Sequence, residues 1–303
     1  WRSHGLEVRM MMFFNIVRCD IKNGILKRWK TYLFTGILFS LLAVFASLDF
    51  DAALRMNPSP VTSTVTLGDY LCFLCGGTSA GNAPIQIMET NNIVNSMFKF
   101  SFPSIWILMY LILLLITLQY PYEDLMGFGK NIMILSNKIH YWWLSKCVWV
   151  TVSAVLYFVV AVVCFSLTSI LLGAEMSFEI GTYYPYFRFS SPDFLKNPPW
   201  NILPTLSMLI PVGIGLCMIQ LVTSMITSRL TSYLISTAFL LASAYMQNVL
   251  LFPNVSMFAR SIEVVTNGQV AWVELIIIAW ISVVCMLTGY LYLKKSDIIN
   301  KHR

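Results

Sequence analysis

The sequence predicts an all-α polytopic membrane protein with six transmembrane helices. Its 303 residues are 57% hydrophobic and 11% charged, and its mean hydropathy is +0.71. Soluble domains carry about 25% charged residues, so this composition is poor in the groups that face water. Six apolar runs of about 18 residues or more are long enough to cross a bilayer as helices. They are Thr31–Leu48, Pro103–Tyr120, Cys147–Leu172, Ile202–Met225, Leu230–Val249 and Val270–Leu293.

The basic residues predict the orientation of these spans. With both termini placed inside, fifteen of the 20 lysines and arginines fall on inner segments. The outer loops hold the remaining basic residues, Arg55, Lys99, Arg188, Lys196 and Arg260. This positive-inside bias predicts a multi-pass protein of the plasma membrane with both termini cytoplasmic. Because the basic residues lie at the span ends, they favour membrane lipids as partners, and no nucleic-acid partner is expected.

The chain before the first span divides into two parts. Residues 1–9 precede Met10 and share no pattern with the residues after it, so we expect an appended segment there. Residues 10–30 are predicted to form an amphipathic helix lying on the membrane surface, ahead of the six-span domain of residues 31–303. The alternative is a simple extension of the first span. The predicted apolar stripe consists of Phe14, Val17, Ile21 and Ile25.

Three loops are predicted to lie outside the cell: residues 49–102, 173–201 and 250–269. The first contains the semi-apolar LGDYLCFLCGG, which is too short to span a bilayer and predicts a short helix ended by glycine. The second is rich in tyrosine and phenylalanine, which is typical of anchors at the bilayer interface. The third is apolar enough to suggest a segment that re-enters the membrane.

Cys72 and Cys75 form a lone C-x-x-C inside the first outer loop. With no second pair and no nearby histidine, they do not favour a zinc site, and no metal site is predicted. Two interpretations remain open. The cysteines are either packed side by side on the short helix or joined as a labile extracellular disulfide.

The spans offer little chemistry. Their one carboxylate is Glu274, about a turn into the last span, a position typical of side chains that reach the headgroups. The segment from Gly127 to Lys130 lacks the first glycine and the Ser/Thr of a phosphate-binding loop. The chain is therefore not expected to hydrolyse ATP, to bind a cofactor or to be an enzyme. A lipid-modifying centre built on His140, Glu123 and Asp124 is the remaining enzymatic alternative.

The stretch from Tyr120 to Lys146 connects the second and third spans. It carries five charged residues and cannot cross the bilayer itself. About 25 residues also exceed what two neighbouring helices need. Its apolar residues follow helical spacing and predict a helix with one apolar side: Leu125, Met126, Phe128, Ile132, Met133 and Leu135. Such a helix either rests on lipid or docks onto a soluble partner.

In architecture, and most sharply between Tyr122 and Lys146, the chain resembles the ABC-2-type permeases, the membrane subunits of ATP-binding-cassette exporters. Glu123 followed by Gly127 matches the acidic residue and glycine with which that family begins its coupling helix, here within residues 121–146. At Asp124 and around Ser136–Lys138 the chain departs from the family pattern. The resemblance implies a cytoplasmic coupling helix between spans two and three, with ATPase-contacting residues Glu123, Asp124, Leu125, Gly127, Phe128 and Lys130.

The resemblance also implies the partners. A separate cytoplasmic ABC ATPase would bind ATP and Mg²⁺, and a second permease copy or a paralogue would complete the exporter. The exported substrate would be amphipathic or hydrophobic (a peptide, a lipid-like molecule or a drug), because desolvated ions need charged partners that the spans lack. The alternative is a membrane immunity or scaffold protein that sequesters such a ligand without turnover.

Overall fold

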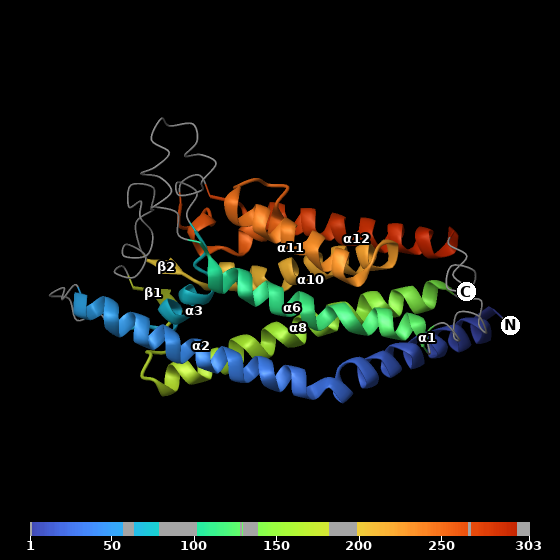
Figure 1. The fold of residues 1–303 in the computed structure, drawn as a ribbon, viewed down its shortest axis with the longest axis horizontal. Coiled ribbons are helices and arrows are strands. Elements are labelled where there is room, and N and C mark those ends of the chain that lie inside the picture. The colour runs from blue at the N-terminus through green and yellow to red at the C-terminus, as the bar shows by residue number, and fades with distance from the viewer. Residues whose placement is uncertain are drawn as a thin grey trace.

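The computed structural model describes residues 2–56, 64–78, 102–127, 129, 139–181, 199–265 and 268–295. They form an elongated bundle of long helices (Figure 1). Among them, five helical segments are long and apolar enough to cross a membrane, which confirms a helical membrane protein. The predicted spans coincide in order with helices α2 (Trp29–Met56), α6 (Ser104–Met126), α8 (Ile139–Leu171), α10 (Leu203–Ile226), α11 (Arg229–Tyr245) and α12 (Ala271–Lys295). Helix α11, with 17 residues, is not among the five candidate spans.

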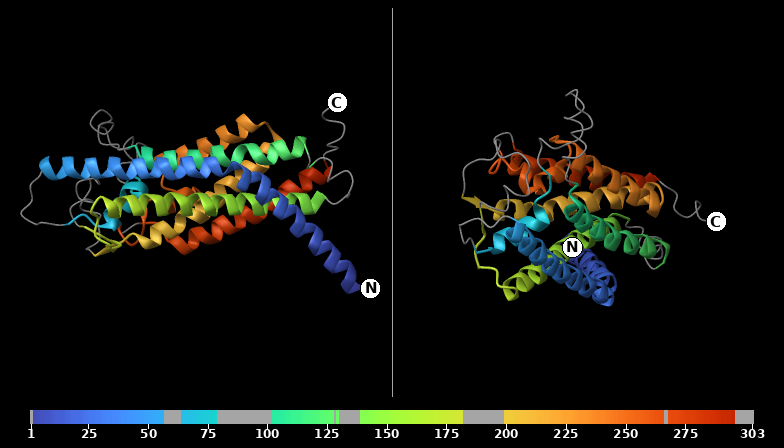
Figure 2. Two further views of the ribbon diagram at one scale, coloured as in Figure 1. Left: turned by 90° about the horizontal axis from the view of Figure 1, so that it is seen from below. Right: turned by 60° about the vertical axis from the view of Figure 1, so that its left-hand side comes forward.

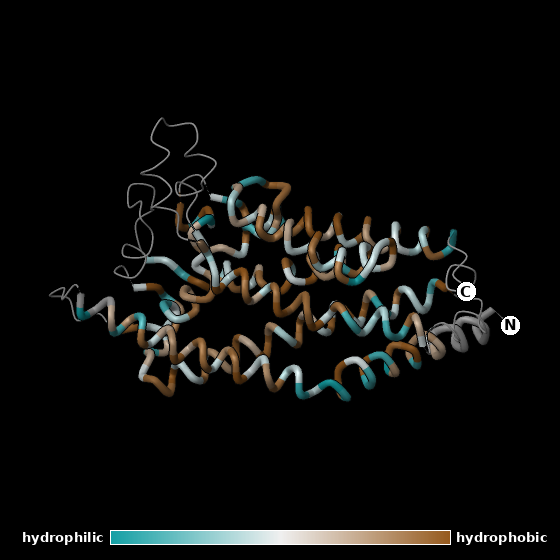
Figure 3. Tube along the Cα trace, in the orientation of Figure 1, coloured by the Kyte–Doolittle hydropathy of each residue, from teal (hydrophilic) through white to brown (hydrophobic). Residues whose placement is uncertain are grey.

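Helix α10 lies at the centre of the bundle. It packs against α6, α8, α11 and α12. In its most apolar stretch of 18 residues, 61% of the residues are buried, whereas the same fraction for α12 is 11%. Gly213 permits the close contact with α8, because a Cβ there would lie 2.4 Å from the Phe158 ring. Apolar residues cover the middle of the bundle (Figure 3), and large exposed side chains such as Trp272 and Trp280 make α12 an outer, lipid-facing helix.

Helix α1 (Arg2–Gly24) is separated from α2 by Ile25 and the 3₁₀ turn η1 (Leu26–Arg28). Figure 2 shows it leaving the bundle at an angle to α2. Its inner face packs against α8. On that face Ile16 and Asp20 are buried, as is Ile25 just after the helix, whereas Phe14 is exposed. The predicted stripe is therefore split: Ile21 and Ile25 pack inward, and Phe14 faces outward.

The opposite end of the bundle contains the short helix α3 (Leu67–Cys75), which confirms the helix predicted in LGDYLCFLCGG. All nine of its residues are buried. Thr66 and Asp69 form a capping box at its start, and Asp69 also accepts a hydrogen bond from the Gly181 amide at 2.9 Å. Burial raises the pKa of Asp69, and these hydrogen bonds oppose that rise. Gly77, at φ +68°, follows the helix.

The described residues also contain a small two-stranded β-ladder. Strands β1 (Glu179–Ile180) and β2 (Trp200–Asn201) pair antiparallel beside α3, with Glu179 opposite Asn201. Backbone bonds from Leu67 and Gly68 to the carbonyls of Glu175 and Ser177 join α3 to the segment before β1. The connecting segments that contain α3, β1 and β2 therefore pack on one another at this end of the bundle. The spacing of apolar residues in the sequence does not predict this contact.

The two cysteines of α3 are not joined, because Cys75 is a free thiol. Cys72 and Cys75 are both almost fully buried on the helix, and burial raises the pKa of Cys75 to about 12. Of the two predicted alternatives, the packed helical pair is the one observed.

The connection from α11 to α12 turns back into the protein through η4 (Phe252–Ser256) and η5 (Phe258–Arg260), and all eight residues of these turns are buried. The Arg260 guanidinium donates to the carbonyl oxygens of Ser243, Ala244 and Thr78 at 2.6, 2.8 and 3.0 Å. It thereby caps the last turn of α11. Burial lowers the pKa of Arg260 to about 10, so the side chain is still charged at neutral pH.

Candidate functional site

The candidate site lies at the end of the bundle where α6 finishes, α8 begins and both termini of the described chain lie (Figure 1), called here the Lys146 end. Lys146 on α8 is fully buried. Its ammonium nitrogen is 2.6 Å from Asp20 Oδ1 on α1 and 2.7 Å from Asp124 Oδ2 on α6. We define the Lys146 cluster as Asp20, Tyr120, Asp124, Trp142, Ser145 and Lys146.

The Asp20 carboxylate accepts hydrogen bonds at both of its oxygens, in addition to its ion pair with Lys146. The Tyr120 hydroxyl donates to Oδ1 at 2.8 Å, and the Ser145 hydroxyl donates to Oδ2. The aromatic rings of Tyr120 and Trp142 also lie 4.9 and 5.3 Å from the Lys146 ammonium. A buried charge that is paired and fully hydrogen-bonded is tolerated, whereas removal of one partner is strongly destabilising. These contacts make the cluster a fixed joint between three helices.

The Asp124 Oδ2 atom, which pairs with Lys146, also accepts a hydrogen bond from the Trp142 indole Nε1 at 2.8 Å. The Asp124 side chain is only 12% exposed. Gly129 packs against this bond, because a Cβ there would lie 2.4 Å from both Asp124 Oδ2 and Trp142 Nε1. The predicted ATPase-contacting residue Asp124 is therefore already engaged within the chain.

Glu123 lies at the surface beside the cluster and forms an ion pair with Arg28 of η1. The two side chains are 50% and 30% exposed, so solvent screens the pair. The neighbouring Tyr122 ring stacks under the Arg229 guanidinium at 4.4 Å, which brings the start of α11 to the end of α6. Glu123 therefore remains reachable from water.

The first turns of α8 also contact α12 and α1. The Trp143 indole donates to the Met286 carbonyl of α12 at 2.8 Å, and Gly289 leaves room for the Trp143 ring. Gly24, at the end of α1, leaves the same kind of room for Trp149, since a Cβ there would lie 2.2 Å from its Nε1. A displacement of the start of α8 would therefore act on α1, α6 and α12 together.

The predicted site residues fall into three groups. Glu123, Asp124 and Leu125 belong to the last turns of α6, and Leu125 packs against the core. Gly127 is exposed at the end of α6 and has only the Glu123 carbonyl near its Cβ position, at 3.2 Å. Phe128 and Lys130 lie outside the described residues, as do residues 131–138 of the predicted coupling region. The described parts of the Tyr120–Lys146 stretch form the last turns of α6 and the first turns of α8.

The lipid-modifying centre that the sequence leaves as an alternative would combine His140 with Glu123 and Asp124. His140 is exposed and stacks on Tyr141 at 4.1 Å, and it makes no hydrogen bond or ion pair with Glu123 or Asp124. No group of three or more histidine, cysteine or acidic side chains that could hold a metal ion occurs in the described part of the chain. The cluster can hold helices together and transmit their movement.

Sequence reasoning missed the central pair of the site. Asp20 is absent from the predicted site residues, and Lys146 enters the prediction only as the end of the Tyr120–Lys146 stretch. A signal existed: Asp20 is the only acidic residue within the basic segment of residues 10–30. An isolated acid in such a segment is a candidate for burial against a distant cation.

The comparison with family models gives one match, described as a protein of unknown function (DUF2705), over residues 73–299. This is about three quarters of the chain. The chain belongs to the DUF2705 family. The matched region begins in α3 and includes α6, α8, α10, α11 and α12. No curated protein and no solved structure matches the chain.

Proposed function

We propose that this DUF2705 protein is the membrane permease subunit of an ATP-driven ABC exporter. The observation that carries the proposal is the Lys146 cluster, which ties α1, α6 and α8 together where residues 127–138 connect α6 to α8. A soluble motor that binds this connection would act on one rigid joint rather than on isolated loops.

The proposed ATPase contact centres on Glu123 and Gly127, which are exposed, with Leu125, Phe128 and Lys130 completing it. Asp124 would act from within, by holding the end of α6 on α8. Closure of the ATPase around ATP would push the start of α8, and the Trp143 contact would pass that movement to α12. ATP and Mg²⁺ would be bound by the partner, and a second copy or paralogue of this chain would complete the exporter.

The proposed topology places the Lys146 end in the cytoplasm of a plasma-membrane protein. Arg28, Lys294 and Lys295 are at the helix ends there, in keeping with the positive-inside rule. Helix α11 serves as the fifth of the six spans. Its 17 residues give a length of about 26 Å, slightly short of a hydrocarbon core of about 30 Å. Exposed Phe14 supports contact of α1 with the membrane surface.

The proposed substrate is amphipathic or hydrophobic. The spans present mostly apolar side chains, and a polar contact such as Thr117 to Gln220, at 3.2 Å, joins α6 to α10. A small hydrated ion would find few charged partners along such a path. The Lys146 cluster does not provide one, because its ammonium is already paired with two carboxylates.

Reconstitution tests the proposal. The chain and a cytoplasmic ABC ATPase of the same cell are placed in proteoliposomes, and Mg-ATP hydrolysis is measured with and without the chain. The proposal expects a complex whose hydrolysis depends on the chain and rises with an amphipathic peptide or drug. A chain that binds such a ligand tightly but never changes ATP hydrolysis would be a sequestering immunity or scaffold protein instead.

A further inference from the structure

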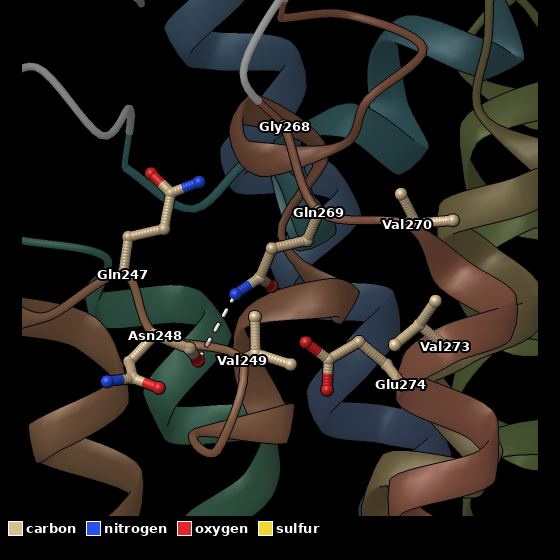
Figure 4. A pocket seen from close by; sticks show the side chains of 8 residues that line it. All are labelled: Gln247, Asn248, Val249, Gly268, Gln269, Val270, Val273 and Glu274. Carbon is tan, nitrogen blue, oxygen red and sulfur yellow. Dashed lines mark hydrogen bonds between the residues drawn. The ribbon is translucent and has the colours of Figure 1, made fainter.

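A cavity of about 600 Å³ lies at the end of the bundle opposite Lys146, between the end of α11 and the start of α12 (Figure 4). Its size falls within the range of small-molecule sites, about 300–1,000 Å³. The lining combines polar and valine side chains from two segments: Gln247, Asn248, Val249, Gly268, Gln269, Val270, Val273 and Glu274. The valines would cover apolar carbons of an occupant.

Glu274 is the charged group of this cavity. Its side chain does not reach the headgroups as expected from sequence, because the residue is only 1% exposed. Figure 4 shows its carboxylate directed from α12 toward Val249 and the Gln269 side chain. The Oε2 atom is buried and has no hydrogen-bond partner among the described residues. Buried carboxylates without a donor are rare in folded proteins, because each costs desolvation energy.

Gln269 presents a second unmatched acceptor. Its Nε2 donates to the Asn248 carbonyl at 3.3 Å, which fixes the orientation of the amide, and its Oε1 is buried without a partner in the described part of the chain. Bonds from the Gln269 amide to the Arg260 carbonyl and from the Ile262 amide to the Gln269 carbonyl hold the backbone at this position. The cavity therefore offers two buried acceptors, one of them a carboxylate, and needs donors.

The nearest cation of the connection does not supply them. The Arg260 guanidinium is committed to carbonyl oxygens of α11 and to Thr78, and it forms no ion pair with Glu274. Water could donate to both acceptors but would leave the carboxylate charge unbalanced. An ammonium group brings three donors and the opposite charge, and it suits an acceptor-lined site beside apolar walls.

We propose that this cavity binds the ammonium group of an amphipathic ligand, with Glu274 as its counter-ion and Gln269 as its second acceptor. The valines would contact the carbons next to the nitrogen. This inference goes beyond the proposed exporter function and does not depend on an ATPase. The same chemistry occurs in a lysine-bearing peptide and in the headgroup of phosphatidylethanolamine.

The test is calorimetric titration of octylammonium into the purified protein in phosphatidylcholine nanodiscs, with empty nanodiscs subtracted. We expect saturable binding to the wild type and at least about tenfold weaker binding to Glu274→Gln, since a charge-assisted contact is lost. Glu263→Gln is the matched control, because Glu263 is exposed on the same connection. Octanol should bind all three proteins equally. Equal octylammonium affinity in wild type and Glu274→Gln would overturn the proposal.

A second measurement needs no variant. Dicyclohexylcarbodiimide modifies carboxyl groups in apolar surroundings, and mass spectrometry reports the labelled fraction of Glu274. Octylammonium should protect Glu274 and octanol should not; absence of protection contradicts the proposal even if Glu274→Gln fails to fold. If added phosphatidylethanolamine weakens octylammonium binding, the native occupant is a lipid headgroup. If affinity is unchanged, a soluble amine such as a peptide lysine is the occupant.

Discussion

Asp20 on α1 and Lys146 on α8 form a buried ion pair of 2.6 Å, although 126 positions separate them in the sequence. This pair fixes the position of α1 on the bundle. It also makes the second carboxylate, Asp124, part of the same joint, since both acids contact one ammonium group.

Replacement of Lys146 by methionine should destabilise the protein by about 3–5 kcal/mol, because two buried carboxylates lose their cation. Thermal or denaturant unfolding in detergent measures the loss. Lys30→Met is the matched control at an exposed lysine and should stay within about 0.5 kcal/mol of wild type. Adding Asp20→Asn to Lys146→Met should recover part of the stability. Strict additivity of the two changes would show that the pair does not interact.

Glu123 and Asp124 are adjacent but should respond differently to loss of charge. Glu123→Gln removes a solvent-screened pair with Arg28 and should cost at most about 1 kcal/mol. Asp124→Asn weakens a nearly buried carboxylate bound to Lys146 and Trp142, so its cost should exceed that of Glu123→Gln by about 1–3 kcal/mol. The melting temperature of Asp124→Asn should be lower than that of Glu123→Gln. Equal melting temperatures would contradict the buried contacts of Asp124.

Replacement of Arg260 by lysine should destabilise the protein. The planar guanidinium reaches several carbonyl oxygens at once, and an ammonium group cannot reproduce that fork. Arg260→Lys is expected to cost about 2–4 kcal/mol by leaving buried carbonyls of α11 without donors. Arg55→Lys, at an exposed position of α2, is the control. Unchanged unfolding of the Arg260 variant would show that other groups satisfy these carbonyls.

The thiols of α3 should be indifferent to redox conditions, because Cys75 is a free, buried thiol. Reducing agent should leave the melting temperature unchanged. Replacement of Cys75 by alanine should be tolerated better than replacement by serine, since a buried hydroxyl without a partner costs about 1–3 kcal/mol. A drop in melting temperature on reduction would instead indicate a disulfide.

The sequence predicted the helices of the bundle well and their side-chain pairings poorly. Long apolar runs locate α2, α6, α8, α10 and α12 because a bilayer requires such runs of any spanning helix. The flanking glycines similarly located α3.

Side-chain partners depend on how helices pack, which periodicity does not encode. Nothing in the sequence pattern therefore indicated that Arg260, within the 250–269 connection, is buried, and the pattern placed Glu274 at the headgroups, whereas the fold buries both. Asp124 resembled a surface residue because its partners, Lys146 and Trp142, follow only after the chain has turned back.

The most direct test of the proposed coupling compares two variants of Gly127 reconstituted with the ATPase. Gly127 is exposed and has little around its Cβ position, so both Gly127→Ala and Gly127→Trp should fold and run as monodisperse protein. The account predicts that Gly127→Ala keeps wild-type, chain-dependent ATP hydrolysis, whereas the tryptophan holds the partner away and lowers that hydrolysis at least about tenfold, equivalent to about 1.4 kcal/mol of lost coupling. Wild-type hydrolysis by the Gly127→Trp complex would contradict the proposed role of the α6–α8 connection.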